Sequence, residues 1–255
     1  MKSFTQLATE IFNEINQLRT DPQGFSKRMQ EIKQFFRANN AIHRPKAVPV
    51  ITHEGIKVLN EAIEELENLQ PLDPLHWSEG LARAAQLHAN DTGTKGIIGH
   101  VGSDDSNVIE RGSKFGKYTE TIAEAVEYGS VSAFEVVSSL LMDDGLYHRP
   151  HRKALINPNF KKVGVGAGLH SIYKTMAVVV FAEGFEDFDE LENVAEPQGY
   201  ITDVPEADEW VEGAVHLNIE TTIEVQGDRK IKKVKRTWEM ADGHHQQTED
   251  VSEID

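Results

Sequence analysis

The sequence predicts a layered α/β domain followed by a C-terminal β-ribbon extension, and three observations carry this prediction. Apolar residues recur at helical spacing over much of the first 145 residues, which is typical of amphipathic helices. Two apolar runs, 163–169 and 176–182, have the length of strands, and the second is apolar on both faces, as in a central strand covered by helices. Beyond residue 213, apolar and polar residues alternate around turn sequences.

The helices follow from apolar periodicity and from capping residues. The first twenty residues form one predicted helix, and Asp21-Pro22 then supplies an N-cap and a proline at the first helical position of a second. A third helix is predicted over 56–66, and a fourth begins after the cap Ser78. Ser132 and Glu135 form a capping box for a fifth helix, which ends at residues 143–145.

Two further segments have a recognisable character. Residues 92–118 are rich in glycine and polar side chains and are too long for a plain connection, which indicates a functional loop. In the tail, strands are predicted over 214–225 and 230–240, with turns at 226–228 and 242–243, so that a ribbon of two or three strands results. Broken alternation at Ile231 and Val234 predicts a bulge near Lys232-Lys233.

The charge is unevenly distributed along the chain. The 255 residues include 42 acidic and 26 basic side chains, a net charge of −16, but residues 1–185 hold 22 acidic and 20 basic ones, whereas residues 186–255 hold 20 and 6. This shift predicts a domain at 1–185, an acidic linker at 186–212 and an acidic β-hairpin extension at 213–255. The acidic balance also argues against a partner that is a nucleic acid.

Residue usage narrows the compartment and the chemistry. The chain has no cysteine, which excludes disulfides, thiolate metal sites and a cysteine nucleophile. Its longest apolar run, 176–182, is far shorter than the roughly 20 residues that span a bilayer, so we expect no integral membrane contact. The first residues lack the apolar core of a signal peptide, and we therefore expect a cytoplasmic or otherwise intracellular protein.

A family resemblance rests on several motifs that occur in a fixed order. They are Glu14–Pro22, Pro74–His88, Gly99–Asp104, Thr119–Ala123, Leu140–Gly145, His148–Arg152, Asn157–Phe160 and Val163–Gly166. Together they resemble the CAP superfamily, or SCP domain, of cysteine-rich secretory proteins, venom antigens and plant pathogenesis-related proteins, in its bacterial and protist branch, over about residues 5–185. The resemblance implies a three-layer α-β-α sandwich. Two departures are Thr119-Glu120-Thr121 in place of Gly-Glu-Asn, and Pro150 in place of the glycine before the last histidine.

The resemblance also implies a cleft lined by two histidines and two acids, which carry over to His100, Glu120, Asp143 and His151. Asp144, Arg152 and Ser106 are expected at its periphery. The donor types suit Zn²⁺ or another divalent cation held by the two histidines. Without a metal, the four residues would form a titrating network or hold loops together by hydrogen bonds. We favour this structural role over catalysis, because no Gly-x-Ser-x-Gly elbow is present and no catalytic residue is identified.

Three functions remain open at this point. The first is a non-enzymatic binding or assembly module that contacts a protein partner through the β extension. The second is a metal-dependent hydrolase, peptidase-like, that uses the four-residue cleft, and the third is lipid or sterol binding. The candidate partner-binding residues are a basic run that we otherwise expect to pair with acidic neighbouring strands: Lys230, Lys232, Lys233, Lys235 and Arg236.

Overall fold

The structure is a computed structural model of the chain. It describes residues 3–38, 40–44, 49–189, 214–226, 229–240 and 242–254. It describes only the backbone of 214–226 and 229–230, and only part of the side chains of 231–240 and 242–254. The chain divides into two compact units, Met1–His43 with Pro49–Glu206 and Arg44–Val48 with Ala207–Asp255. We call these the body and the C-terminal unit and describe each by itself.

A four-stranded sheet forms the centre of the body, with the strand order β3-β6-β7-β5. Its strands are β3 (His76–Trp77), β5 (Ile122–Tyr128), β6 (Lys162–His170) and β7 (Lys174–Ala182). The pair β3–β6 is parallel and the other two pairs are antiparallel. From Thr175 to Ala182 every residue of β7 is buried, as expected for a central strand with helices on both faces.

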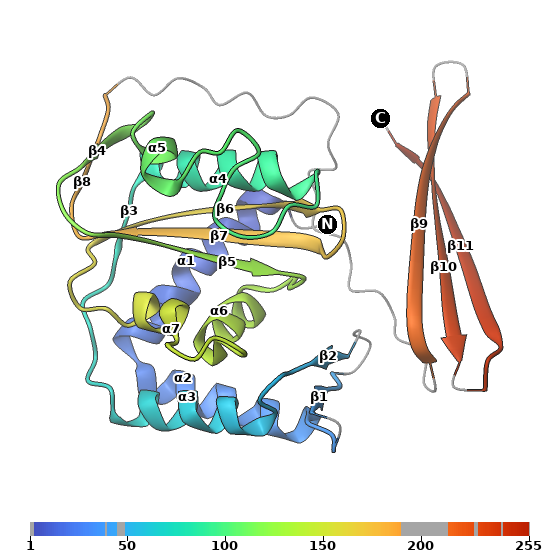
Figure 1. The fold of residues 1–255 in the computed structure, drawn as a ribbon, viewed down its shortest axis with the longest axis horizontal. Helices are drawn as coiled ribbons and strands as arrows, with labels where there is room; N and C mark the ends of the chain where they lie inside the picture. The colour runs from blue at the N-terminus through green and yellow to red at the C-terminus, as the bar shows by residue number, and fades with distance from the viewer. Residues whose placement is uncertain are drawn as a thin grey trace. The chain divides into compact units, whose positions relative to one another are not determined.

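Helices cover both faces of this sheet (Figure 1). On one face lie α4 (Glu79–Gly93) and α5 (Val108–Gly112); on the other lie α1 (Phe4–Thr20), α6 (Ala133–Met142) and α7 (Pro150–Leu155). Further from the sheet, α2 (Pro22–Gln30), a 3₁₀ helix (Glu31–Phe35) and α3 (Ile56–Asn68) complete the second helical layer. Two apolar cores result, one on each side of the sheet, and the predicted α-β-α sandwich is confirmed.

The backbones of α4 and β6 approach each other very closely. A Cβ atom on Gly164 would lie 2.0 Å from the backbone nitrogen of Ala82, and one on Gly166 would lie 2.3 Å from that of Gln86. Gly168, further along the strand, has more room, because its Cβ would meet nothing nearer than 3.8 Å. Gly164 and Gly166 therefore allow α4, which carries part of the candidate site, to lie directly on the sheet.

Short strand pairs extend the body at two places. β1 (Ala41–Ile42) pairs with β2 (Val50–Ile51), and β4 (Gly116–Tyr118) pairs with β8 (Phe185–Asp187). The carboxylate of Asp187 accepts hydrogen bonds from the Ser78 hydroxyl (2.7 Å) and the Gly80 backbone N–H (2.6 Å) at the start of α4. The last described strand of the body, β8, thus ends at Asp187. Residues 190–213, which include most of the expected acidic linker, lie outside the described residues.

The C-terminal unit is a three-stranded antiparallel sheet in the order β11-β10-β9. Its strands are β9 (Ala214–Gln226), β10 (Arg229–Met240) and β11 (His245–Ile254), so the ribbon has three strands. The predicted bulge near Lys232-Lys233 is wrong: both residues keep regular register with β9 and β11, and the register shift lies between Glu239 and Met240.

Besides the short strands β1, β2, β3, β4 and β8, three elements near the candidate site escaped the sequence analysis. α5 and α7 have five and six residues, too short for a helical period to emerge. β5 contains Glu124 and Glu127, which interrupt its apolar run. Pro150, one of the two departures from the family pattern, occupies the first turn of α7, where a proline fits because its missing N–H would have no helical partner.

Candidate functional site

The candidate site begins with the segment after α4, residues 94–107, which we call the His100 loop. Side chains from three elements, two of them fully buried, hold the backbone of its central residues. The Gly99 N–H donates to the Tyr128 hydroxyl on β5 (2.8 Å), and His88 Nε2 on α4 lies 2.9 Å from the Gly99 carbonyl. Arg111 on α5 donates to the His100 carbonyl from both terminal nitrogens (3.1 and 3.2 Å). The loop is therefore fixed at the residue that carries the imidazole.

His88 is a core histidine with a defined protonation state. Its side chain is fully buried, and burial lowers its pKa below the ordinary value although the hydrogen bond to Gly99 opposes this shift. Because Nε2 faces a carbonyl oxygen, Nε2 carries the hydrogen in the neutral ring. His88 therefore belongs to the apolar core around α4, where it acts on the His100 loop through the backbone.

The first histidine–carboxylate pair joins His100 to Glu124. His100 Nδ1 lies 3.0 Å from Glu124 Oε1, and the other carboxylate oxygen accepts from Arg111 Nη2 at 2.7 Å. The side chains of Glu124 and Arg111 are each 2% exposed, whereas that of His100 is 52% exposed. Burial raises the pKa of Glu124, but the His100 hydrogen bond and the Arg111 charge outweigh it, so the net shift is downward.

The second pair joins His151 to Asp143. Asp143 ends α6 in the left-handed region (φ 53°), and its carboxylate accepts from the His151 backbone N–H (2.7 Å) and the Arg152 backbone N–H (3.2 Å) at the start of α7. His151 Nδ1 lies 2.8 Å from Asp143 Oδ1. The same carboxylate thus caps α7 and orients the ring of its second residue.

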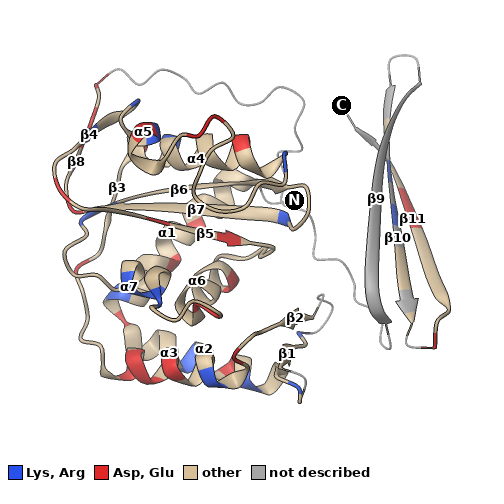
Figure 2. Ribbon diagram, viewed as in Figure 1, with Lys and Arg blue, Asp and Glu red and all other residues tan. Residues whose placement is uncertain are grey.

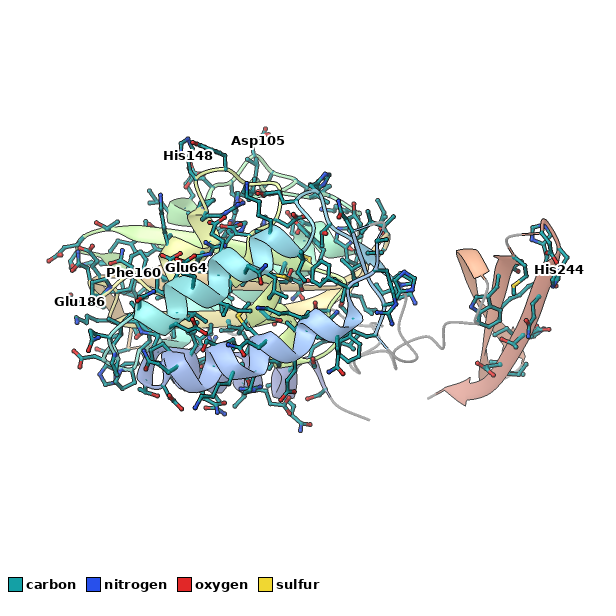
Figure 3. All side chains as sticks on the ribbon, turned by 90° about the horizontal axis from the view of Figure 1, so that it is seen from below. Glu64, Asp105, His148, Phe160, Glu186 and His244 are labelled. Carbon is teal, nitrogen blue, oxygen red and sulfur yellow. The ribbon has the colours of Figure 1, made fainter. Side chains whose placement is uncertain are left out.

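The two pairs lie near each other where the His100 loop approaches the start of α7, and we use the name cleft for the space between the His100 and His151 rings. The ring centroids of His100 and His151 are 6.1 Å apart. Asp105 and His148, from the loops that precede α5 and α7, project from the same edge of the body (Figure 3). Since each Nδ1 faces a carboxylate, each ring keeps its Nε2 available for a ligand or a proton. Two imidazole nitrogens from separate elements are therefore presented to one space.

The structure brings three of the four expected cleft residues together. Glu120, the fourth, is exposed at a bend before β5, and Glu124 stands in the carboxylate position beside His100. The sequence predicts Glu120, four residues earlier, because Glu120 matches the glutamate of the family motif. A charged residue inside an otherwise apolar strand segment was the signal that could have indicated Glu124, because such a residue needs a buried partner.

The three residues expected at the periphery hold the surrounding loops. Ser106 accepts from Arg111 through its backbone carbonyl at 2.7 Å. Asp144 accepts from the backbone N–H groups of His53 (2.7 Å) and Glu54 (2.9 Å) just before α3. Arg152 donates from Nε to the Leu141 carbonyl and from Nη2 to the Met142 carbonyl at the end of α6. These residues connect the cleft walls to the helical layer behind them.

A cavity of about 530 Å³ lies on the α3 side of α7 and does not include the cleft histidines. Its charged lining is an ion-pair network in which Arg149 bonds Glu54 and Glu61, and Arg152 bonds Glu61 and Glu65. Hydrogen bonds from Arg149 lower the pKa of Glu54 and of Glu61 to about 2. Acidic residues of α3 and basic residues of α7 line this cavity, and Figure 2 shows the acidic positions of α3 and the basic positions of α7. The full lining is Glu54, Lys57, Glu61, Glu65, Tyr147, His148, Arg149, Arg152 and Lys153.

The expected divalent cation finds only a partial set of ligands. A carboxylate behind each imidazole is the arrangement found around metal-binding histidines. However, among the residues that the structure describes, no group of three His, Asp or Glu side chains is placed to hold an ion. Catalytic zinc sites ordinarily have three protein ligands. The cleft therefore offers two nitrogen ligands and falls short of a complete catalytic metal site.

The basic run of the tail lies in β10, the central strand of its sheet. Lys235 is opposite Glu220 of β9 and Glu249 of β11, and Lys233 is opposite Thr222 and Val251. The backbones of Lys230, Lys232 and Arg236 are placed in the same register, whereas not all of their side chains are described. For Lys235, acidic residues do occupy the positions on both sides.

As to membranes, no described helix is long and apolar enough to cross one.

An α-β-α sandwich with two histidine–carboxylate pairs across one cleft defines this chain as a domain of the CAP type. The family model described as "CAP: Cysteine-rich secretory protein family" matches residues 12–181, and the chain belongs to this family. It is similar to the uncharacterized protein YkwD of Bacillus subtilis (strain 168), with 25% identity over 130 residues. The match covers 51% of this chain and 47% of YkwD, so the chain spans about half the length of that relative.

Several solved structures have partial similarity to this chain. An outer surface protein from Borrelia burgdorferi has a TM-score of 0.37 and 24% identity, over 53% of this chain and 97% of its own. An extracellular protein containing a SCP domain from Bacillus anthracis str. Ames has a TM-score of 0.36 and 20% identity, and the match covers 49% of this chain and 39% of that protein. BmVAL-1 has a TM-score of 0.36 and 14% identity, and the match covers 70% of this chain and 77% of BmVAL-1.

Proposed function

We propose that this chain is a non-enzymatic CAP-family binding module whose C-terminal sheet contacts a protein partner. The observation that carries the proposal is the sheet itself, a separate unit of strands with 13, 12 and 10 residues. It lies beyond the family match, which ends at residue 181. Strands of this length exceed the usual 5–6 residues and offer long edges for pairing with another chain.

The cleft supports a binding role better than a catalytic one. Hydrolysis needs a nucleophile activated by a base, or a metal-bound water with a placed base. Here Glu124 is bonded to both Arg111 and His100, and Asp143 is bonded to two backbone N–H groups and to His151. Both carboxylates therefore have structural partners that fix the surrounding loops and helix ends. The hydroxyl of Ser106 bonds Asp104. These bonds favour a rigid recognition surface over an acid–base pair.

The test compares the full chain with a chain that ends at residue 206. Both are immobilised and exposed to extract of the source cells, and retained proteins are identified by mass spectrometry. Circular dichroism of the shortened chain checks that the helices of the body remain. We expect specific partners to be lost with the C-terminal unit, whereas retention of every partner by the shortened chain would contradict the proposal.

A second candidate function, binding of a divalent cation in the cleft, is favoured by the carboxylate behind each histidine. Calorimetric titration of the full chain with Zn²⁺ at neutral pH tests it. Binding should disappear in His100→Ala and in His151→Ala but persist in His76→Ala, an exposed histidine of β3. Equal binding by all three variants and the unchanged chain would exclude the cleft as the cation site.

The intracellular location and the lipid alternative stay predictions.

A further inference from the structure

β11 forms one edge of the C-terminal sheet, with β10 on its inner side. Every side chain from His245 to Val251 is exposed, and Val251 is 61% exposed. Neighbouring side chains of a strand point to opposite faces. Both faces of β11 are therefore accessible over these residues, and its outer side presents alternating backbone N–H and C=O groups, as edge strands do.

The charge of β11 is of one sign. The strand contains Glu249, Asp250 and Glu253 but no lysine or arginine. Its inner neighbour β10 has the opposite character, with six basic residues between Arg229 and Arg236. Figure 2 shows acidic positions of β11 beside basic positions of β10. Within this sheet, the strand that pairs with acidic β11 is thus a basic one.

The register shows how this pairing matches charges. Glu249 is opposite Lys235, and Lys233 lies diagonally between Glu249 and Glu253, because it is opposite Val251. Opposite charges at such cross-strand positions stabilise a pair, and like charges destabilise it. A strand on the outer side of β11 would meet the same acidic side chains on the same two faces. It would be favoured if it carried basic residues at matching positions.

We propose that the outer edge of β11 accepts an extended basic segment of a protein partner as a fourth strand of the sheet. This inference rests on the proposed function and names the surface and the partner chemistry. Main-chain hydrogen bonds would supply the sequence-independent part of the affinity. Selectivity and a fast association rate would come from lysine or arginine opposite Glu249, Asp250 and Glu253.

A second copy of this chain is a poor occupant of the same edge. Two β11 edges that paired with each other would place side by side two strands that each have three acidic positions and no lysine or arginine. Like charges directly opposite each other in a sheet are destabilising. Acidic residues on an edge strand thereby oppose self-association while they leave the edge open to a basic strand. The charge argument therefore selects a different, basic protein.

Fluorescence anisotropy of the full chain with a labelled peptide tests the proposal. The probe is the sequence of residues 229–240 with blocked ends, and its matched control has every lysine and arginine replaced by glutamate. We expect the basic probe to bind and the control to show no measurable binding. Raising NaCl from about 50 to about 300 mM should weaken binding several-fold, because the attraction is between exposed charges. Amide exchange should show new protection in β11 while β10 retains its own protection, which distinguishes addition from strand exchange.

Variants of the full chain locate the site. Glu249→Lys with Asp250→Lys should weaken probe binding by at least about 10-fold, whereas Glu64→Lys, an exposed charge reversal on α3, should leave it unchanged. Thr248→Pro and Glu249→Pro test the backbone. Because amides alternate in direction along a strand, one of these two prolines removes an outward N–H and leaves the β10 ladder intact, as circular dichroism can verify. That variant should lose binding.

The outcomes separate this inference from the proposed function. If the acidic control binds as well as the basic probe, or Glu64→Lys weakens binding as much as the β11 variants, the edge proposal is overturned. If the natural partner is captured by the full chain and by every β11 variant alike, the edge proposal fails but the partner-binding function stands. If the chain that ends at residue 206 retains every partner, the function itself fails.

Discussion

Replacing Arg111 with methionine tests whether the His100 loop depends on one buried arginine. Its guanidinium makes four hydrogen bonds: to the Ser106 carbonyl (2.7 Å), twice to the His100 carbonyl (3.1 and 3.2 Å) and to Glu124 Oε2 (2.7 Å). Arg111→Met keeps much of the volume and removes all four bonds. It leaves Glu124, whose side chain is 2% exposed, as a buried carboxylate without its arginine partner.

Removing one member of a buried ion pair costs about 3–5 kcal/mol. That cost is a large fraction of a typical folding free energy of about 5–15 kcal/mol, so the variant should fold with much reduced stability. We would measure it by urea denaturation, followed through the circular dichroism signal at helical wavelengths, to which the helices of the body contribute far more than the described C-terminal strands. Lys161→Met, which breaks an exposed 3.7 Å pair with Asp73, should cost less than about 1 kcal/mol.

The pH dependence gives the same prediction a second readout. In the folded chain the pKa of Glu124 lies below its ordinary value of 4.5, so its stabilising contribution is present above that pH and is lost as the pH falls through the folded pKa. In Arg111→Met, burial is no longer opposed by the arginine, and the pKa of Glu124 rises. The difference in the free energy of unfolding between the unchanged chain and Arg111→Met should therefore become smaller as the pH falls from about 7 towards 4.5.

A double variant decides whether the unpaired carboxylate is the cause. Glu124→Gln in the Arg111→Met background removes the uncompensated charge, and we expect it to recover at least about 1 kcal/mol. A loss of less than about 1 kcal/mol in Arg111→Met, or no recovery in the double variant, would refute the reasoning, since the arginine would then not compensate a buried carboxylate.

Three further predictions follow from the fold and the cleft. Gly164→Ala should cost about 1–3 kcal/mol or more in chemical denaturation, whereas Gly168→Ala should be nearly neutral, because only the first places a Cβ against the α4 backbone. Asp143→Ala should lower the thermal midpoint more than Asp143→Asn, since asparagine tolerates the left-handed backbone and keeps one cap acceptor. His88→Gln should flatten the loss of stability that the unchanged chain shows as the pH falls below 6.5, because the pKa of His88 is lowered by folding; an equally steep profile in that variant would contradict this assignment.

Local signals in the sequence predicted most of the helices and the two long strands of the body. The N-caps at Ser78 and Ser132 are present as predicted, with each hydroxyl accepting a backbone N–H three residues on. The central strand over 176–182 followed from its apolar content on both faces. Such features depend on residues close in sequence, so periodicity and capping chemistry suffice to indicate them.

The cleft depends on contacts that no local pattern contains. Glu124 is compatible with a buried strand only because Arg111, thirteen residues earlier and on another element, supplies the opposing charge. Neither α5 nor β5 was expected from periodicity, so the pairing of their side chains could not be foreseen. The family motif located the right segment but placed the carboxylate at Glu120, because matching residue types does not show where the strand begins: Glu120 lies at an exposed bend before β5, whereas Glu124 lies within it.

The short helix α7 explains how the two faces of this region are joined. The guanidinium groups at its start bind the α6 C-terminus, with Arg149 donating to the Asp143 carbonyl (3.0 Å) and Arg152 to the Met142 carbonyl (3.0 Å). Cations at a helix C-terminus are favoured by the unpaired carbonyls and the helix dipole. The same arginines are bound by Glu54, Glu61 and Glu65 beside the α3 cavity. Asp143, at the end of α6, orients the ring of His151, and the arginines bonded to the end of α6 are themselves paired on the opposite side of α7. The cleft and the cavity therefore belong to one hydrogen-bonded network.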